Sequence, residues 1–160
     1  MEEATERLVR LFLESKGFLV RTNEKFKADV NKYPEIDIIA IRMKNNENDN
    51  IPDRIIGEVK SWSIKKADLL GVKDKFKIFF KYKRETKQHI KNKYGNGFQF
   101  VIFSREPSKK NLDTVKQELE RNNISFYWLE DIADKIKDYS KERGYTNDPE
   151  LQILRLMRES

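Results

Sequence analysis

A carboxylate and an ammonium lie two residues apart near the middle of the sequence, a pairing that could serve acid–base or metal-dependent chemistry. Glu58 and Lys60 belong to the segment Arg54–Ser61, in which Ile55, Ile56 and Val59 are typical of a buried strand. Side chains two apart on a strand share a face, so Glu58 and Lys60 point the same way. Charges on an apolar strand are costly to desolvate unless they serve a function. The alternative interpretation is a surface ion pair, because such pairs are common.

A third charged residue lies on the strand that precedes this segment. That strand is predicted over Glu35–Ile41, and Asp37 stands among its isoleucines, on the same face as the strand's first residue. Aspartate is depleted in strands and rarely buried without a partner. The polar run Lys44–Asn50 predicts a hairpin loop between the two strands. An antiparallel pairing would bring Asp37 beside Glu58 and Lys60.

A helix is predicted over Glu2–Lys16, before the strands. Its apolar residues recur at helical spacing, and Gly17 follows as a helix-ending residue. Glu6 borders the apolar stripe, so it could reach a site at the edge of the sheet. It could equally be a carboxylate that interacts favourably with the helix dipole. Glu3, one turn earlier, could take the same role as Glu6.

Composition limits the class of protein. The chain has 160 residues, 38% of them hydrophobic and 38% charged, which is enough for one domain with a real core. It has no cysteine, so a disulfide framework and a thiolate metal site are excluded. No apolar run approaches the length of a membrane span, and the charged N-terminus does not resemble a signal peptide. We therefore expect a soluble, cytoplasmic protein with no membrane partner.

The positive charge of the chain is local. The segment Lys65–Lys93 holds eleven lysines and arginines against three acids, a net charge of +8, whereas the whole chain carries +6. Such a run is either a solvated face or a nucleic-acid groove, and its place directly after the Glu58 strand favours the groove. A helix is predicted to begin after Ser63 and to extend through Phe80. The lysines expected to bind DNA are Lys65, Lys66, Lys73 and Lys77, while His89, the only histidine, is expected to be solvated.

The remaining pattern predicts the order α-β-β-β-α-β-α-β-α-α. A mixed central sheet flanked by helices follows from that order, and thus an α/β fold class. The predicted elements are a strand that starts at Phe18–Val20, a polar loop over Thr22–Tyr33, a strand at Phe98–Phe103, a helix at Lys109–Arg121, a strand at Ile124–Leu129, and helices at Asp131–Tyr139 and from Asp148 onward. We predict one domain over residues 1–160, with a core over about 1–104 and a C-terminal αβα extension over about 105–160.

The succession of Glu6, Asp37 and Glu58-Val59-Lys60 resembles the PD-(D/E)xK nuclease superfamily. That resemblance covers about Glu6 to Ser104 and implies a restriction-endonuclease-like fold with an αβββαβ core. The segment from Glu6 to Phe18 looks like the opening helix of archaeal Holliday-junction resolvases. The sequence departs from the motif at its Pro-Asp, where Ile36 precedes Asp37.

The resemblance implies a metal-dependent DNA endonuclease, either structure-specific like the resolvases of DNA repair and recombination, or similar to restriction and Mrr-like enzymes. Asp37 and Glu58 would bind Mg²⁺ together with the Val59 carbonyl, and Mn²⁺ would be able to substitute. Lys60 would orient the attacking water, and Glu6 would reach the site from its helix. A homodimer is expected because paired incisions need two active sites. The alternative is a catalytically inactive DNA-binding or assembly module on a nuclease fold.

Overall fold

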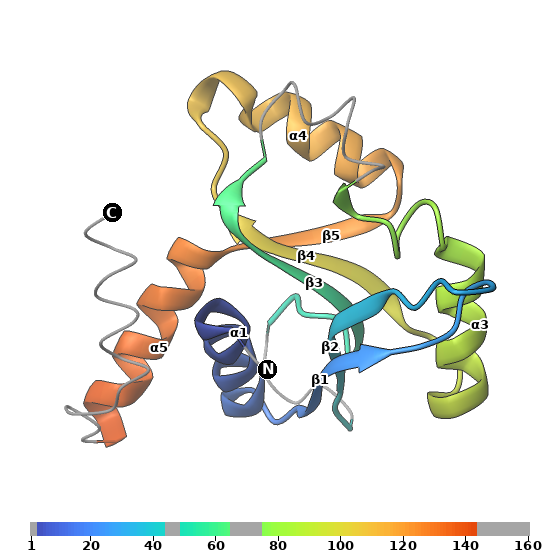
Figure 1. The fold of residues 1–160 in the computed structure, drawn as a ribbon. Coiled ribbons are helices and arrows are strands. Elements are labelled where there is room, and N and C mark those ends of the chain that lie inside the picture. Colours follow the sequence, from blue (N-terminus) through green and yellow to red (C-terminus); the bar gives the residue numbers. More distant parts are fainter. Residues whose placement is uncertain (1–2, 44–48, 65–74, 144–160) are drawn as a thin grey trace.

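The computed structural model describes residues 3–43, 49–64 and 75–143, which form an α/β structure with a five-stranded sheet (Figure 1). The predicted mixed sheet flanked by helices is confirmed. The strands are β1 (Leu19–Lys25), β2 (Glu35–Ile41), β3 (Arg54–Ser63), β4 (Gln99–Arg105) and β5 (Ile124–Trp128). The described helices are α1 (Ala4–Ser15), α3 (Lys83–Tyr94), α4 (Lys109–Arg121) and α5 (Leu129–Arg143).

The strands lie in the sheet in their sequence order. β1, β2 and β3 pair antiparallel, whereas β3, β4 and β5 pair parallel. The predicted antiparallel pairing of β2 with β3 is therefore confirmed. The β3–β4 ladder is irregular at its end, because Val59 pairs with Phe103 and the next pair is Ser63 with Arg105. β3 thus carries two more residues than β4 between these pairs.

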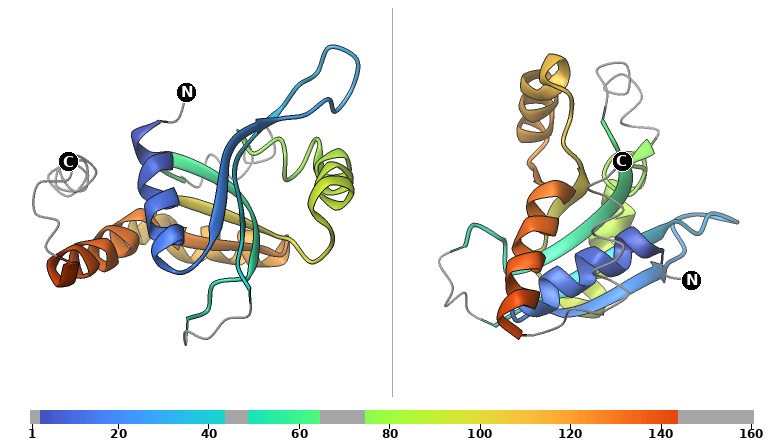
Figure 2. Two further views of the ribbon diagram at one scale, coloured as in Figure 1. Left: turned by 90° about the horizontal axis from the view of Figure 1, so that it is seen from below. Right: turned by 90° about the vertical axis from the view of Figure 1, so that its left-hand side faces the viewer.

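Helices cover both faces of the sheet (Figure 2). α3 connects β3 to β4 and α4 connects β4 to β5, and because parallel crossovers are right-handed, both helices lie on the same face. Their buried residues, among them Ile90 and Val115, pack with Ile56 and Phe100 of the sheet. α1 and α5 cover the other face, where apolar residues such as Phe12 and Ile132 form the second part of the core.

A polar cluster around the buried Glu24 connects β1 to α3. The Glu24 carboxylate accepts hydrogen bonds from Lys93 Nζ at 2.9 Å and Tyr94 Oη at 2.6 Å, and lies 2.7 Å from His89 Nε2. Burial opposes the ionisation of Glu24, but these partners outweigh it and lower its pKa to about 2. The cluster corrects two predictions. β1 extends through Lys25 rather than giving way to a loop at residue 22, and His89 is not a solvated side chain but stacks on Phe26.

The predicted helix after Ser63 lies partly outside the described residues, which omit 65–74, and it is wrong from Phe76 onward. The segment that contains Phe76 and Phe80 is a series of turns, with hydrogen bonds from Phe79 N to Phe76 O and from Tyr82 N to Lys77 O, and α3 begins only at Lys83. Phe76, Ile78 and Phe79 are all buried, so the segment is enclosed on more than one side. Their spacing is also that of one face of a helix, but here a series of turns places these side chains in the core.

The connection between β2 and β3 is held by one buried arginine. The Arg42 guanidinium lies 2.7 Å from the Asp53 carboxylate and 2.6 Å from the Asp49 carboxylate, and it donates to the Ile51 carbonyl at 2.8 Å. It also stacks over the Phe18 ring, 4.6 Å from the ring centroid. Asp53 is therefore engaged at the far end of β3 from Lys60 and is not available to a site beside Glu58.

The C-terminal part of the described chain completes the sheet. β5 pairs with β4, and α5 packs on α1, so residues beyond 105 join the same sheet and core as the N-terminal elements. The helix predicted from Asp148 lies outside the described residues, as do the apolar side chains near it. Within the described ranges, no helix has both the length and the apolar character needed to cross a membrane.

Candidate metal centre

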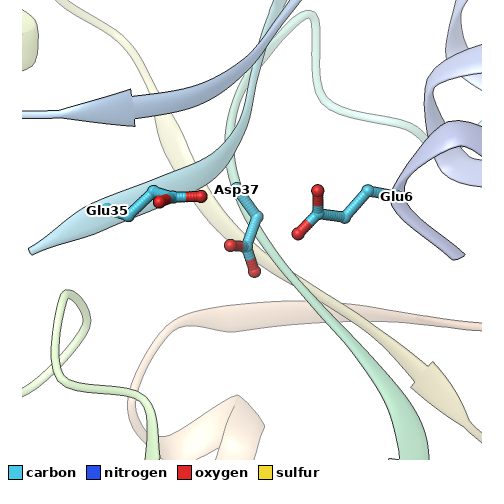
Figure 3. Close-up of side chains that lie close together, drawn as sticks. All are labelled: Glu6, Glu35 and Asp37. Carbon is cyan, nitrogen blue, oxygen red and sulfur yellow. The ribbon is translucent and has the colours of Figure 1, made fainter. Parts of the chain in front are cut away.

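Three carboxylates from two elements converge beside the sheet (Figure 3). Asp37 and Glu35 come from β2 and Glu6 comes from α1, and Asp37 lies between the other two. One carboxylate oxygen from each lies within 4.8 Å of the others. Glu6 is buried and the other two side chains are half-buried. This spacing allows all three to contact one cation.

The end of the β2–β3 ladder creates the space for Asp37. The last pair of this ladder toward the site is Ile38 with Gly57. Beyond this pair, the Asp37 carboxylate takes the place of a backbone carbonyl of β2 and accepts a hydrogen bond from the Val59 N–H at 2.9 Å. A Cβ atom at Gly57 would lie 3.1 Å from both Ile38 Cβ and Phe103 Cε2, so a larger residue would require these neighbours to shift.

Glu58 and Lys60 border the three carboxylates from β3. Glu58 is 6% exposed, and the Lys60 ammonium lies 3.5 Å from its Oε2 atom. The ammonium also lies 5.8 Å from the ring centroid of the buried Phe76. The predicted shared face of Glu58 and Lys60 is confirmed. The interpretation of this pair as a solvent-exposed surface bridge is not, because Glu58 is buried.

The electrostatics of the cluster disfavour ionised carboxylates. Burial, followed by the charge of Asp37, raises the pKa of Glu58 to about 8 against the opposing influence of Lys60. Burial also raises the pKa of Asp37, although the Val59 N–H and Lys60 favour its charged form. The pKa of Glu6 is raised by burial and by Asp37. Closely placed carboxylates with raised pKa values are typical of sites that bind a cation.

Glu6 has a structural role as well as a place in the cluster. Its carboxylate accepts the Glu3 backbone N–H at 3.3 Å and completes a capping box at the start of α1. The side chain of Asn23, in β1, hydrogen bonds to the same carboxylate. The two interpretations of Glu6 are therefore compatible: its position in the first helical turn favours a carboxylate, and that same position brings the carboxylate to Asp37.

The predicted site residues are brought together at one end of β2 and β3. Asp37 accepts the Val59 N–H, Lys60 contacts Glu58, and the charges of Asp37 and Glu6 both act on Glu58. Glu58 is not one of the three carboxylates whose oxygens lie within 4.8 Å of one another. Of the predicted DNA-binding residues, Lys77 is exposed in the turn segment, and Lys65, Lys66 and Lys73 lie outside the described residues. Exposure alone does not test DNA binding by Lys77, so that role stays a prediction.

Two members of the cluster were not assigned from the sequence. Glu35 was placed on the face of Asp37 without a role, although a second carboxylate two residues away on the same strand was a usable signal. Asn23 was placed in a loop. Its side chain meets Glu6 because β1 continues past residue 22 and the backbone of Asn23 adopts a φ of 57°. No local pattern indicates such a contact between β1 and α1.

The donor set has a definite metal preference. Glu6, Glu35, Asp37 and Glu58 offer only carboxylate oxygens, which suit hard cations such as Mg²⁺, Ca²⁺ and Mn²⁺. His89, the ligand that Zn²⁺ would prefer, is bound to Glu24 in the separate polar cluster. The residues present therefore fit a hard divalent cation.

Comparisons with known proteins found no match. No protein-family model matches the sequence, and neither the curated proteins nor the solved structures yield a significant match.

Proposed function

We propose that this chain is a metal-dependent DNA endonuclease of the PD-(D/E)xK type, with a restriction-endonuclease-like core. The observation that carries the proposal is the meeting of Asp37, Glu58 and Lys60 at one end of two paired strands, with Glu6 beside them from α1. A surface ion pair would not require a buried glutamate, and a structural salt bridge would not gather three further carboxylates around it.

The proposed cation site uses the charge of the carboxylates. Asp37, Glu58 and the Val59 carbonyl would hold Mg²⁺ or Mn²⁺. Glu6 and Glu35, each with a carboxylate oxygen within 4.8 Å of one of Asp37, would contact the ion directly or through water. When bound, the cation supplies positive charge that stabilises the developing charge on a phosphoryl group and makes water more acidic. Burial and the charge of Asp37 raise the pKa of Glu58, and a bound cation would favour its charged form against both.

Lys60 would act on the water and the phosphate. Its ammonium is held between the Glu58 carboxylate and the Phe76 ring, so it enters the site with restricted freedom. An ammonium in that position can donate hydrogen bonds to the attacking water and to a non-bridging phosphate oxygen. Such preorganised donors stabilise the transition state without reorganisation at the moment of reaction. Glu6 would orient a second water through its carboxylate.

The proposed substrate is DNA because the chain is basic outside this acidic site. A net charge of +6 and a local excess over Lys65–Lys93 favour a polyanion. Contacts from lysines to phosphates fix position without reading sequence, so binding should depend strongly on salt and weakly on sequence.

The deciding experiment measures cleavage and binding separately. Asp37→Asn, Glu58→Gln and Lys60→Ala should each lower cleavage by at least about 100-fold and retain DNA binding in Ca²⁺. Asp113→Asn, an exposed carboxylate on α4, is the matched control and should cleave normally. A panel of four-way junction, flap, duplex and single strand, each with Mg²⁺ or Mn²⁺, identifies the preferred DNA structure.

The outcomes separate the two interpretations of the fold. Cleavage by all three variants at the wild-type rate would remove the assigned site. Binding of DNA by the wild-type protein without cleavage under either metal would identify an inactive DNA-binding module. Light scattering with and without DNA tests the proposed homodimer, which a strict monomer in both conditions would contradict.

A further inference from the structure

A cavity of about 920 Å³ lies at the amino-terminal ends of β4 and β5 and shares no residue with the carboxylate cluster. Its lining comes from the start of α3, the end of α4 and the two strands between them. Volumes of about 300–1,000 Å³ are typical of sites for small molecules. The cavity is therefore large enough for a ligand and independent of the proposed metal centre.

The α3 side of the cavity is cationic. Lys83 and Lys87 line it and lie one helical turn apart, so their side chains project from the same face of α3. In the part of the chain that the structure describes, neither ammonium is within 4.0 Å of a carboxylate. Like charges at this spacing destabilise a helix slightly, and an anion between them would relieve the repulsion.

Aromatic rings supply an apolar surface next to these lysines. Phe98, Phe100 and Phe126 line the cavity, and the Lys87 ammonium lies 5.5 Å from the Phe100 ring centroid. The rings are held in place from behind: Phe100 stacks on Phe79 at 4.5 Å, and Phe126 stacks on Trp128 at 4.8 Å between centroids. Phe98 and Phe126 remain half-buried, so part of each is open to a ligand.

The remaining side of the cavity offers hydrogen-bonding groups of a different kind. Glu120 and Asn123, at the end of α4, contribute a carboxylate and an amide to the lining. Glu120 is exposed and has no salt bridge with the lysines of α3 in the described residues. A carboxylate there disfavours a second anion and favours a ligand group that donates hydrogen bonds.

We propose that this cavity binds a nucleotide. The phosphate would lie between Lys83 and Lys87, the base would lie against Phe98 and Phe126, and an exocyclic amino group of the base would donate to Glu120. Cationic side chains beside aromatic rings are the usual combination for a phosphorylated base, either free or within a single strand. The arrangement predicts a preference for adenine or cytosine, which carry an amino group, over thymine, which carries none.

The test is calorimetric titration of the full chain in EDTA, so that metal-dependent chemistry does not contribute. The ligands are adenosine 5′-monophosphate, thymidine 5′-monophosphate, adenosine, inorganic phosphate and an eight-residue single-stranded oligodeoxyadenylate. We expect adenosine 5′-monophosphate to bind more tightly than the other three small ligands. Comparison with the oligonucleotide then shows whether a free nucleotide or a strand is preferred.

Paired variants assign the contacts. Replacing both Lys83 and Lys87 by Gln should weaken nucleotide binding by about tenfold or more, whereas the matched double variant Lys109→Gln with Lys110→Gln, two exposed lysines of α4, should bind normally. Glu120→Gln should reduce the preference for adenine over thymine. Binding of phosphate as tight as that of the nucleotide, equal effects of the two lysine pairs, or no binding of any nucleotide would each overturn the proposal.

Discussion

Replacing Glu58 by Gln should stabilise the metal-free protein, although Glu58 is buried and paired with Lys60. The reason is that the folded state raises the pKa of Glu58 from 4.5 to about 8. Between these two values the native state holds a proton that the unfolded state releases. Wild-type stability therefore decreases as pH rises through this window, and the loss is complete above about pH 8. Glutamine remains neutral throughout and avoids the loss.

The shift sets the size of the effect. Because one pKa unit corresponds to about 1.4 kcal/mol, the change from 4.5 to about 8 corresponds to about 5 kcal/mol above pH 8. This value is an upper bound, since the amide loses its charged contact with Lys60 and buries its own polar atoms. We expect Glu58→Gln to raise the free energy of unfolding by about 1–3 kcal/mol at pH 8, and by much less at pH 5.

Urea unfolding in EDTA at pH 5 and pH 8 measures this difference, with Asp113→Asn as the control that should show no pH-dependent change. The same experiment with Mg²⁺ should reverse the order. Ligands that bind only the native state stabilise it, and the wild type would gain more than the variant, which lacks one carboxylate. If the variant is less stable than the wild type in EDTA at pH 8, the burial of the Glu58 carboxylate and its repulsion from Asp37 do not dominate at this site.

Three further changes test other parts of the fold. Glu24→Gln should destabilise the protein by about 2 kcal/mol at pH 7. Since the pKa of Glu24 is lowered to about 2, the stabilising effect of its charge is lost as pH falls from 4.5 toward 2. A difference in stability from the wild type that persists unchanged in urea unfolding at pH 2 would contradict this. Arg42→Met should cost about 3 kcal/mol because it leaves Asp49 without its buried partner, and an unchanged thermal midpoint would show that the connection does not depend on this contact. Gly57→Ala should cost about 1–3 kcal/mol through overpacking against Ile38, and wild-type stability in urea would mean that the two strands separate without strain.

The sequence was most informative where local rules decide the geometry. Asp37, Glu58 and Lys60 were brought together by side-chain alternation and one hairpin, both of which depend on residues close in the chain. The helix over Lys109–Arg121 was also predicted with the bounds that the structure has, because its apolar spacing and its flanking turns agree.

Prediction failed where distant residues decide. Glu24 looked like part of a polar loop, yet His89, Lys93 and Tyr94 of α3 satisfy its charge and keep it inside the sheet. Phe76, at helical spacing from its neighbours, belongs to a turn because the core encloses that segment from several sides. In both cases a partner remote in the chain compensates for a local preference, and a single sequence does not indicate that partner.

The irregular end of the β3–β4 ladder places Glu58 and Lys60 in different backbone surroundings. Glu58 pairs with Ile102 inside the regular ladder, so its backbone is held on that side. Lys60 lies beyond Val59, in the stretch where β3 has two surplus residues and the pairing is interrupted. The backbone of Lys60 therefore lies outside the ladder, and its ammonium is positioned by Glu58 and the Phe76 ring instead. Two surplus residues keep the alternation of side chains between the two faces of the sheet in phase. Deleting one residue from this stretch would turn every later side chain of β3 to the opposite face.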